Sequence, residues 1–236
     1  TNTAGVGGGF ITQTNPTGGN GLSTGTEANG LMTIAMGRHY DRGNDALTVV
    51  TSNALNLSGS AVTGQWTVDN YVMFDYDQYD PTHLADHAED HVANRSKMVF
   101  GFQSSNGTWI KSTSNFVALE IQLATNRIRV LDGLDADATA GNIFAEVANI
   151  EAIDRIDEDG FSVEATFNPD ETFTVTIKGL EGTFVGGAAF GDLVLSDSLD
   201  AGMFATLFGS DVYMSTTVHQ PDWDGAITLD VEDQVK

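Results

Sequence analysis

The sequence predicts an all-β fold, an antiparallel β-sandwich of the jelly-roll type. Two observations carry this prediction: apolar and polar residues alternate with a period of two along most of the chain, and short stretches rich in Gly, Asn and Asp separate the alternating runs. Ten such runs are enough for two antiparallel sheets that pack on each other. A chain of 236 residues with 41% hydrophobic content can bury one large core, so we expect one sandwich domain.

The expected strands are defined by this alternation and by the turn residues that flank them. They lie at residues 31–40, 46–53, 64–77, 97–104, 115–124, 127–133, 160–169, 172–180, 212–220 and 226–233. The clearest hairpin is "GFSVEATFNPDETFTVTIKGL", in which two alternating runs meet at Asn168, Pro169 and Asp170. Proline fixes φ near the value that a tight turn needs, so the turn of this hairpin is predicted together with its strands.

One short helix is expected at residues 81–93, between two strands. Asp80 is a natural N-cap, Pro81 suits the first helical position, and Asn94 can end the helix. Apolar residues recur at a spacing of four within this stretch, so one side of the helix can rest on the sandwich.

Residues 1–30 are expected to form an N-terminal arm, followed by a single sandwich domain at residues 31–236. The arm holds nine glycines and few large apolar side chains. Because fixing such backbone costs about 1–2 kcal/mol per residue, an ordered arm needs contacts that hold it. The arm would either pair as an edge strand on its own domain or add a strand to a neighbouring subunit, with Val6, Phe10 and Ile11 making the contact.

Charge and cysteine content exclude several classes of protein. Ten Lys and Arg residues stand against 33 Asp and Glu residues, for a formal net charge of -23. Such a chain repels nucleic acid and anionic membrane surfaces, while its acids keep the surface soluble or hold Ca²⁺. The absence of cysteine excludes disulfides and thiolate metal sites. The chain begins at Thr1, from which we expect an extracellular or cell-surface protein after removal of a signal peptide, or alternatively a trimmed chain.

Acidic residues in two short stretches are candidate Ca²⁺ ligands. In "FDYDQYD", Asp75 and Asp77 would share one strand face and Asp80 would follow at the turn. In "RGND", Asn44 and Asp45 offer further oxygens. Oxygen ligands of this kind suit a hard cation, although neither stretch has the spacing of an EF-hand loop. A solvated acidic surface is the alternative interpretation.

Three histidines, His83, His87 and His91, recur at a spacing of four within the expected helix. Two neighbouring imidazoles at this spacing can bind one ion, but the three span about 12 Å of helix, too far for one metal to reach all of them. Any metal therefore needs a ligand from elsewhere. A solvated rim, a transition-metal site or subunit contact, and a pH switch near pH 6–7 all remain open.

Tryptophans near strand ends are the candidate glycan-binding residues. Trp66, Trp109 and Trp223 lie in or beside expected loops. In "HQPDWDG", the ring of Trp223 can stack on a sugar face while Asp222 and Asp224 accept hydrogen bonds from its hydroxyl groups. Packing of these rings in the core is the alternative interpretation.

The C-terminal half of the chain resembles a known superfamily. The stretch "FVALEIQLATNRIRVL", the hairpin at residues 160–180 and "VYMSTTVHQPDWDGAITLDVED" follow one another as a flat strand, a hairpin and a closing strand after a polar loop. This order resembles concanavalin A-like, laminin-G-like sandwiches. The resemblance implies the sandwich fold, and its members bind glycans, adhere to surfaces or degrade polysaccharides, so the fold alone does not choose among these functions.

The degrading enzymes of that superfamily provide a test. Laminarinase-type glucanases have Glu-x-Asp on one strand followed closely by a second Glu. In "ALEIQLAT", Glu120 matches the first carboxylate, but Gln122 replaces the aspartate and no second acid follows. One glutamate cannot supply both catalytic roles. The acids of "EAIDRIDEDG" have spacings of three and four residues, which fit a helical turn or a solvated loop. The sequence therefore predicts a protein that is not an enzyme.

Three functions follow, in order of preference. The first is a secreted structural protein that associates with copies of itself through the N-terminal arm into a fibre, tube or sheath. The second is a monomeric lectin-like module that binds polysaccharide or adheres to it. The third is a polysaccharide-degrading enzyme, whose carboxylate pair folding would have to bring together from distant segments.

Overall fold

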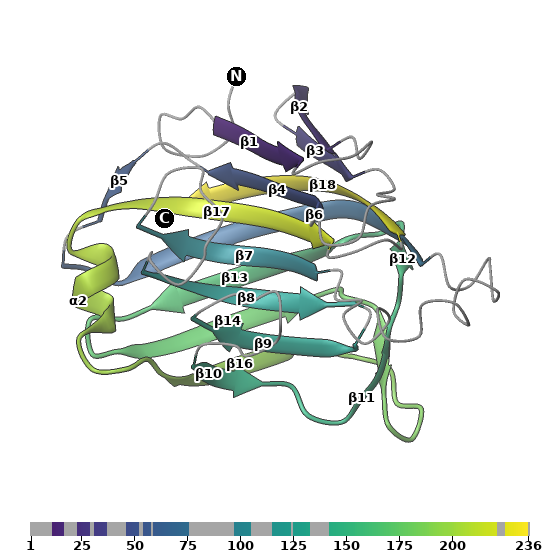
Figure 1. Cartoon of the computed structure of the whole chain (residues 1–236). Helices are drawn as coiled ribbons and strands as arrows, with labels where there is room; N and C mark the ends of the chain where they lie inside the picture. The colour runs from purple at the N-terminus through teal and green to yellow at the C-terminus, as the bar shows by residue number, and fades with distance from the viewer. Residues whose placement is uncertain are drawn as a thin grey trace.

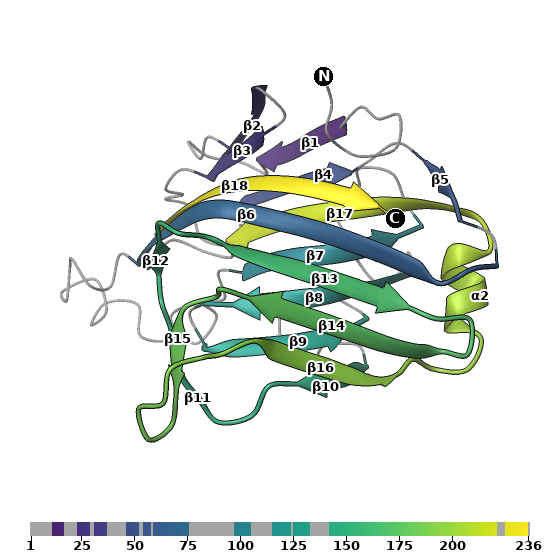
Figure 2. The same cartoon turned by 180° about the vertical axis from the view of Figure 1, so that it is seen from behind.

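The computed structural model describes residues 11–16, 23–28, 31–36, 46–51, 54–57, 59–75, 97–104, 115–123, 125–132, 142–220 and 225–235. Two eight-stranded antiparallel sheets pack face to face. We call the sheet nearer the viewer in Figure 1 the front sheet and the one nearer the viewer in Figure 2 the back sheet. The predicted antiparallel β-sandwich is confirmed.

The front sheet is a path of seven strands, and β5 (Leu55–Asn56) pairs with β17 beside that path. In spatial order the seven are β1 (Ile11–Pro16), β4 (Ala46–Thr51), β17 (Asp211–Gln220), β7 (Lys97–Gln103), β8 (Phe116–Gln122), β9 (Arg127–Leu131) and β10 (Ile143–Glu146).

The back sheet is also a path of seven strands, and β12 (Ile156–Asp157) pairs with β6 beside it. In spatial order the seven are β16 (Leu193–Ser198), β14 (Thr172–Lys178), β13 (Phe161–Phe167), β6 (Val62–Asp75), β18 (Gly225–Val235), β3 (Leu31–Met36) and β2 (Ser23–Ala28). A separate two-stranded sheet joins β11 (Ile150–Ile153) to β15 (Gly182–Phe184).

The core lies between the two sheets and is built by the inward side chains of both. Trp66 of β6 is 1% exposed and packs against Phe100 and Phe102 of the opposite sheet, with ring centroids 6.1 and 5.9 Å away. Alternation places one face of each strand in this core, and burial of a large apolar side chain stabilises the fold by about 1.5–3 kcal/mol. Trp66 is therefore a core residue of β6, which agrees with the alternative interpretation of these tryptophans as core residues.

A short helix, α2 (Met203–Phe208), closes one end of the core. Phe204, Leu207 and Phe208 of this helix are buried. The turn of the β13–β14 hairpin supports its start, because the Glu171 carboxylate accepts hydrogen bonds from the backbone N–H groups of Gly202 (2.9 Å) and Phe204 (2.8 Å). The sequence analysis missed α2, and the helix expected at residues 81–93 lies outside the described residues.

All ten predicted strands are present, and the hairpin at residues 160–180 is confirmed. Asp170 shapes its turn: the hydroxyl and the N–H of Thr172 donate hydrogen bonds to its carboxylate, and they lower its pKa. The sequence analysis missed most of the short strands, namely β5, β10, β11, β12, β15 and β16, because they are too short for a period of two to be visible. Among the described residues, no helix is long and apolar enough to cross a membrane.

Two strands of the expected N-terminal arm pair within this chain. β1 forms the edge of the front sheet next to β4, and β2 forms the edge of the back sheet next to β3. Ile11 begins β1 opposite Thr51, whereas Val6 and Phe10 lie outside the described residues. The described part of the arm thus extends the sheets of its own sandwich, and the role of these residues in assembly stays a prediction.

Candidate functional site

The register of the strands brings several chain positions together at the end of the sandwich opposite α2, which we call the loop end (Figure 1). In the front sheet, Ala46 at the start of β4 pairs with Gln220 at the end of β17. In the back sheet, Gly225 at the start of β18 pairs with Asp75 at the end of β6. Only residues 221–224 separate β17 from β18, so these strand ends from both sheets lie at the same end of the molecule.

The predicted ligand residues flank these strand ends. Asn44 and Asp45 immediately precede Ala46, and Asp77 and Asp80 follow Asp75. The segment with His83, His87 and His91 connects β6 to β7, and β7 begins at the loop end because Lys97 pairs with His219. Asp222, Trp223 and Asp224 form most of the link between β17 and β18. All of these except Asp75 lie outside the described residues, but the strands that flank them end together.

Trp109 belongs to a different part of the molecule by the same criterion. It lies outside the described residues, in the connection between Gln103 of β7 and Phe116 of β8, which pair with each other. Gln103 also pairs with Tyr213, near the start of β17 and close to α2. The flanks of Trp109 are therefore at the α2 end, whereas those of Trp223 are at the loop end.

The outer face of the front sheet is buried over β7 and β8. Strands β7 and β8 are buried at every residue, on the outer as well as the inner face. Four apolar outer residues form a small second core, Val99, Phe116, Ala118 and Leu131. Beside it lies a set of buried polar residues that we call the polar layer: Lys97, Gln103, Glu120, Gln122, Arg129, Ser215 and Thr217.

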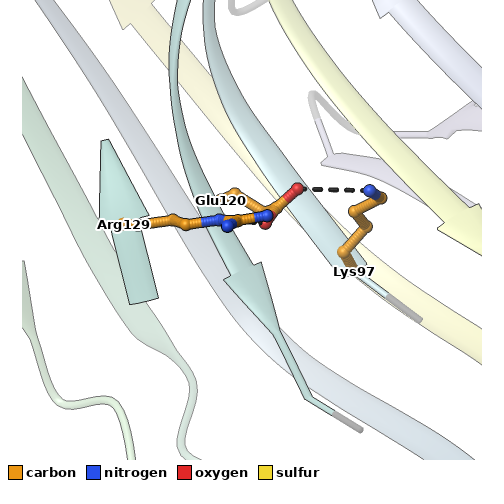
Figure 3. Close-up of polar contacts among 3 residues, drawn as sticks. All are labelled: Lys97, Glu120 and Arg129. Atoms are coloured by element: carbon orange, nitrogen blue, oxygen red, sulfur yellow. Dashed lines mark hydrogen bonds and ion pairs between the residues drawn. The ribbon is translucent and has the colours of Figure 1, made fainter. Parts of the chain in front are cut away.

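An ion triad is the centre of the polar layer (Figure 3). Arg129 donates a hydrogen bond from Nε to Oε1 of Glu120 at 2.7 Å, and Nζ of Lys97 lies 3.2 Å from Oε2 of the same carboxylate. The side chains of Lys97 and Glu120 are each 1% exposed. Because each oxygen of Glu120 already has a cationic partner, this carboxylate is unsuited to act as nucleophile or acid, or to bind a metal ion.

Three other members of the polar layer have unused hydrogen-bonding capacity. Oε1 of Gln103, Oε1 of Gln122 and Oγ1 of Thr217 are buried and have no hydrogen-bond partner among the residues that the structure describes. Gln122 is opposite Lys97 in the ladder, and Thr217 is opposite Val99, so both lie close to the triad. Buried oxygens of this kind are usually satisfied by ordered water, so the polar layer is suited to hold water on the outer face of the front sheet.

The outer face of the back sheet is exposed and polar. A shallow groove of about 290 Å³ runs over β6, β13 and β14, lined by polar side chains that include Gln65, Thr67 and Lys178. Gln65 donates a hydrogen bond to Glu164 of the neighbouring strand. Over the described side chains of β6, β13 and β14, this face is open to water and holds no buried charge.

The acids of "EAIDRIDEDG" are arranged differently from the prediction. Glu151 lies in β11 and Asp157 in β12, so the interpretation as a helical turn was wrong, whereas Asp154, Glu158 and Asp159 are exposed and lie outside the strands, as expected for a solvated loop. Asp157 is 1% exposed and pairs opposite Tyr71 of β6. Across the described part of the chain, no three His, Asp or Glu side chains converge closely enough to hold a metal ion as they stand.

Sequence reasoning considered Glu120 but missed the triad. Lys97, Glu120 and Arg129 each occupy a strand position that alternates with inward apolar residues, and this pattern predicts an exposed polar face. Their pairing depends on the register of three strands, which no local pattern encodes. A possible signal was the apolar character of their neighbours on the same outer face, Val99 and Leu131, which is unusual for a solvated face.

Comparisons with known proteins identify the fold. No family model matches the sequence, and no curated protein matches it. The legume lectin-like domain from Entamoeba histolytica is similar over 95% of this chain and 88% of its own, with a TM-score of 0.52 and 10% identity. The seed lectin of Lotus tetragonolobus is similar over 96% of this chain and 94% of its own, with a TM-score of 0.51 and 14% identity. The chain therefore has the legume lectin-like, concanavalin A-like sandwich fold, which extends across nearly its whole length.

Proposed function

We propose that this chain is a non-catalytic carbohydrate-binding domain whose glycan site lies at the loop end. The observation that carries the proposal is the register of the sheets, because it brings together the flanks of three connections that hold acids, histidines and Trp223. Both structural neighbours are described as lectin or lectin-like, which supports glycan binding and a role outside catalysis. An extracellular location fits this function.

The chemistry expected at the loop end suits a neutral glycan. An indole ring offers a flat apolar face for stacking, and the carboxylates of Asp222 and Asp224 accept hydrogen bonds from sugar hydroxyl groups. A protein with a net charge of -23 repels sulfated and uronic acid sugars. Neutral hexose oligosaccharides are therefore the ligand class that this end fits best.

Calcium is a possible component of this site. Asp75, Asp77 and Asp80 with Asn44 and Asp45 supply only oxygen donors, the kind that Ca²⁺ prefers. The described flanks, Ala46 and Asp75, both lie at the loop end. A bound Ca²⁺ would fix the carboxylates so that they face the sugar.

The lectin-like function is better supported than self-assembly. Self-assembly was expected because an ordered arm needs a strand to pair with, which a neighbouring subunit could supply. However, β1 and β2 pair with β4 and β3 of this chain. Degradation of polysaccharide is less well supported, because Glu120 is enclosed by Lys97 and Arg129.

The proposal is tested by glycan binding with a matched pair of tryptophan variants. An array of neutral oligosaccharides built from mannose, galactose, glucose and N-acetylhexosamine identifies a ligand, whose affinity is then measured by titration calorimetry. We expect Trp223→Ala to weaken binding at least tenfold, since loss of a stacked ring removes more than about 1.4 kcal/mol. Trp109→Ala, flanked by strands of the α2 end, should bind as the parent protein does.

Two results would contradict this proposal. The first is the absence of binding to any oligosaccharide on the array by a folded protein, in the presence of 5 mM Ca²⁺ as well as without it. The second is equal affinity in Trp223→Ala and the parent protein, which would move the glycan site away from the loop end.

A further inference from the structure

A buried carboxylate lies where the small two-stranded sheet meets the back sheet. Asp157 of β12 is opposite Tyr71 of β6 in the ladder, and both side chains are buried, at 1% and 0% exposure. Asp154 directly follows β11 and Glu181 directly precedes β15, and the N–H of Asp154 donates a hydrogen bond to the carbonyl of Glu181 at 3.0 Å. We call Asp154, Asp157, Asp159 and Glu181 the acidic corner.

The two oxygens of Asp157 have unequal environments. Oδ1 accepts hydrogen bonds from the backbone N–H of Asp159 at 3.0 Å and of Gly160 at 2.7 Å, which fixes the carboxylate in place. Oδ2 is buried and has no partner anywhere in the structure that is described here. A buried carboxylate oxygen without a partner is unfavourable unless a cation or water meets it.

The other acids of the corner increase the negative potential around this oxygen. The pKa of Glu181 is raised, chiefly by the charge of Asp157, then by burial and by the charges of Asp154 and Asp159. Burial raises the pKa of Tyr71, and the charges of Asp157, Asp154 and Glu181 raise it further. The corner therefore concentrates negative charge around a fixed, unsatisfied oxygen.

Space for an additional ion is present beside the corner. An open hollow of about 550 Å³ is lined by Asp154 and Glu181 and by the chain between Gly179 and Asp192 that includes β15. Asp154 and Glu181 are both exposed, so their side chains can change rotamer freely, whereas Asp157 is fixed.

We propose that the acidic corner binds Ca²⁺, with Oδ2 of Asp157 as the fixed ligand and the exposed carboxylates of Asp154 and Glu181 turning toward the ion. As they stand, the three carboxyl groups do not converge, and the ion would draw them together. Ca²⁺ takes six to eight oxygens at flexible geometry, so water and backbone carbonyls complete the shell. The bound ion would join β12 of the back sheet to β11 and β15 of the small sheet. This site lies at the same end of the sandwich as the predicted glycan site but is built on β11, β12 and β15, and it does not depend on glycan binding.

The direct test counts Ca²⁺ ions on metal-free protein by titration calorimetry and by equilibrium dialysis with ⁴⁵Ca²⁺. Asp157→Asn keeps the Oδ1 acceptor for the turn but removes the charge, so the turn should remain intact. We expect this variant to bind one Ca²⁺ fewer than the parent protein, and Glu181→Gln to bind the ion at least tenfold more weakly. Asp197→Asn, an exposed acid at the far end of β16 from this corner, is the matched control and should bind as the parent does.

Thermal unfolding provides a second test, because a purely structural role for Asp157 would not make the Tm depend on Ca²⁺. In excess Ca²⁺ the parent protein should unfold at a Tm about 3 °C or more above its metal-free value, because only the folded state binds the ion. In EDTA, Asp157→Asn should unfold at or above the parent Tm, because the substitution removes repulsion, and Ca²⁺ should not raise it.

Three results would overturn the Ca²⁺ site: no Ca²⁺ bound by the parent protein, an unchanged number of Ca²⁺ ions in Asp157→Asn, or an equal Ca²⁺-induced rise in Tm in that variant. A failure of the glycan proposal would leave all of these counts unchanged, so the two proposals are tested separately.

Discussion

The outer faces of the two sheets differ although both sheets have the same strand geometry. On the back sheet, the outer residues of β13 and β14 are exposed or partly exposed and alternate regularly with buried inner residues. One row across this sheet consists only of hydroxyl side chains, from Thr63 through Thr166 and Thr174 to Ser196. On the front sheet, β7 and β8 are buried on both faces.

This difference shows how burial changes the role of a polar residue. On the back sheet, water can satisfy any polar group that lacks a partner, so hydroxyl, amide and charged side chains occur together with few constraints. On the front sheet, a charge must find its partner within the protein, and the triad of Lys97, Glu120 and Arg129 meets this requirement. The polar layer should therefore be sensitive to substitution, and the back face should tolerate it.

The largest expected difference in the free energy of unfolding between the two faces comes from replacing one glutamate on each face by alanine. Glu120→Ala leaves Lys97 and Arg129 buried without their shared anion, so we expect it to lower the free energy of unfolding by about 3–5 kcal/mol. Glu164→Ala, on the exposed back face beside Gln65, should change it by less than about 0.5 kcal/mol. Urea unfolding at pH 7, followed by circular dichroism, measures both.

Equal effects at the two glutamates would show that the front face is solvated after all. A third variant sharpens the comparison: Lys97→Met, Glu120→Leu and Arg129→Met together remove the whole triad. Because no charge is then left unpaired, this protein should be more stable than Glu120→Ala alone.

A smaller difference is expected when a methyl group is added to a glycine. On the outer front face, a Cβ at Gly101 would lie 2.3 Å from the carbonyl oxygen of Val117 and 2.6 Å from Cβ of Ala118. Since backbone on β8 cannot move without disturbing the ladder, Gly101→Ala should lower the free energy of unfolding by about 1–3 kcal/mol. Gly191→Ala meets nothing within 4 Å and is the control, expected to be near neutral. Equal thermal midpoints for the two variants would contradict a tightly packed front face.

Most of the sandwich could be predicted from local patterns. The alternation in the hairpin at residues 160–180 reports the half-buried back sheet directly, and its turn residues fix the connection. The front strands were also predicted from alternation, but alternation indicates an exposed outer face, so the burial of β7 and β8 on both faces was not predicted. Strands β5, β10, β11, β12 and β15, which have two to four residues, and the helix α2 depend on packing against the core, and a short window of sequence does not contain that information.

The candidate site could be predicted by residue type but not by arrangement. Local composition singled out the acids after Asp75 and the indole of Trp223, yet only the pairing of Gly225 with Asp75 places their flanks together. Asp157 shows the converse: its spacing from Asp154 suggested a helix face, whereas pairing with β6 buries it. Contacts between distant segments decide both cases, and a single sequence does not specify them.

The smallest expected difference in the free energy of unfolding comes from replacing one threonine by valine on each face. Oγ1 of Thr217 is buried in the polar layer without a partner in the described chain, so replacing this hydroxyl by a methyl group of similar size removes an unsatisfied polar atom. Thr217→Val should raise the free energy of unfolding by about 1 kcal/mol. Thr174→Val, in the exposed hydroxyl row, should change it by less than about 0.5 kcal/mol. If Thr217→Val is instead destabilising, an ordered water bonds to this hydroxyl, and the polar layer is a hydrated layer whose oxygens are all satisfied.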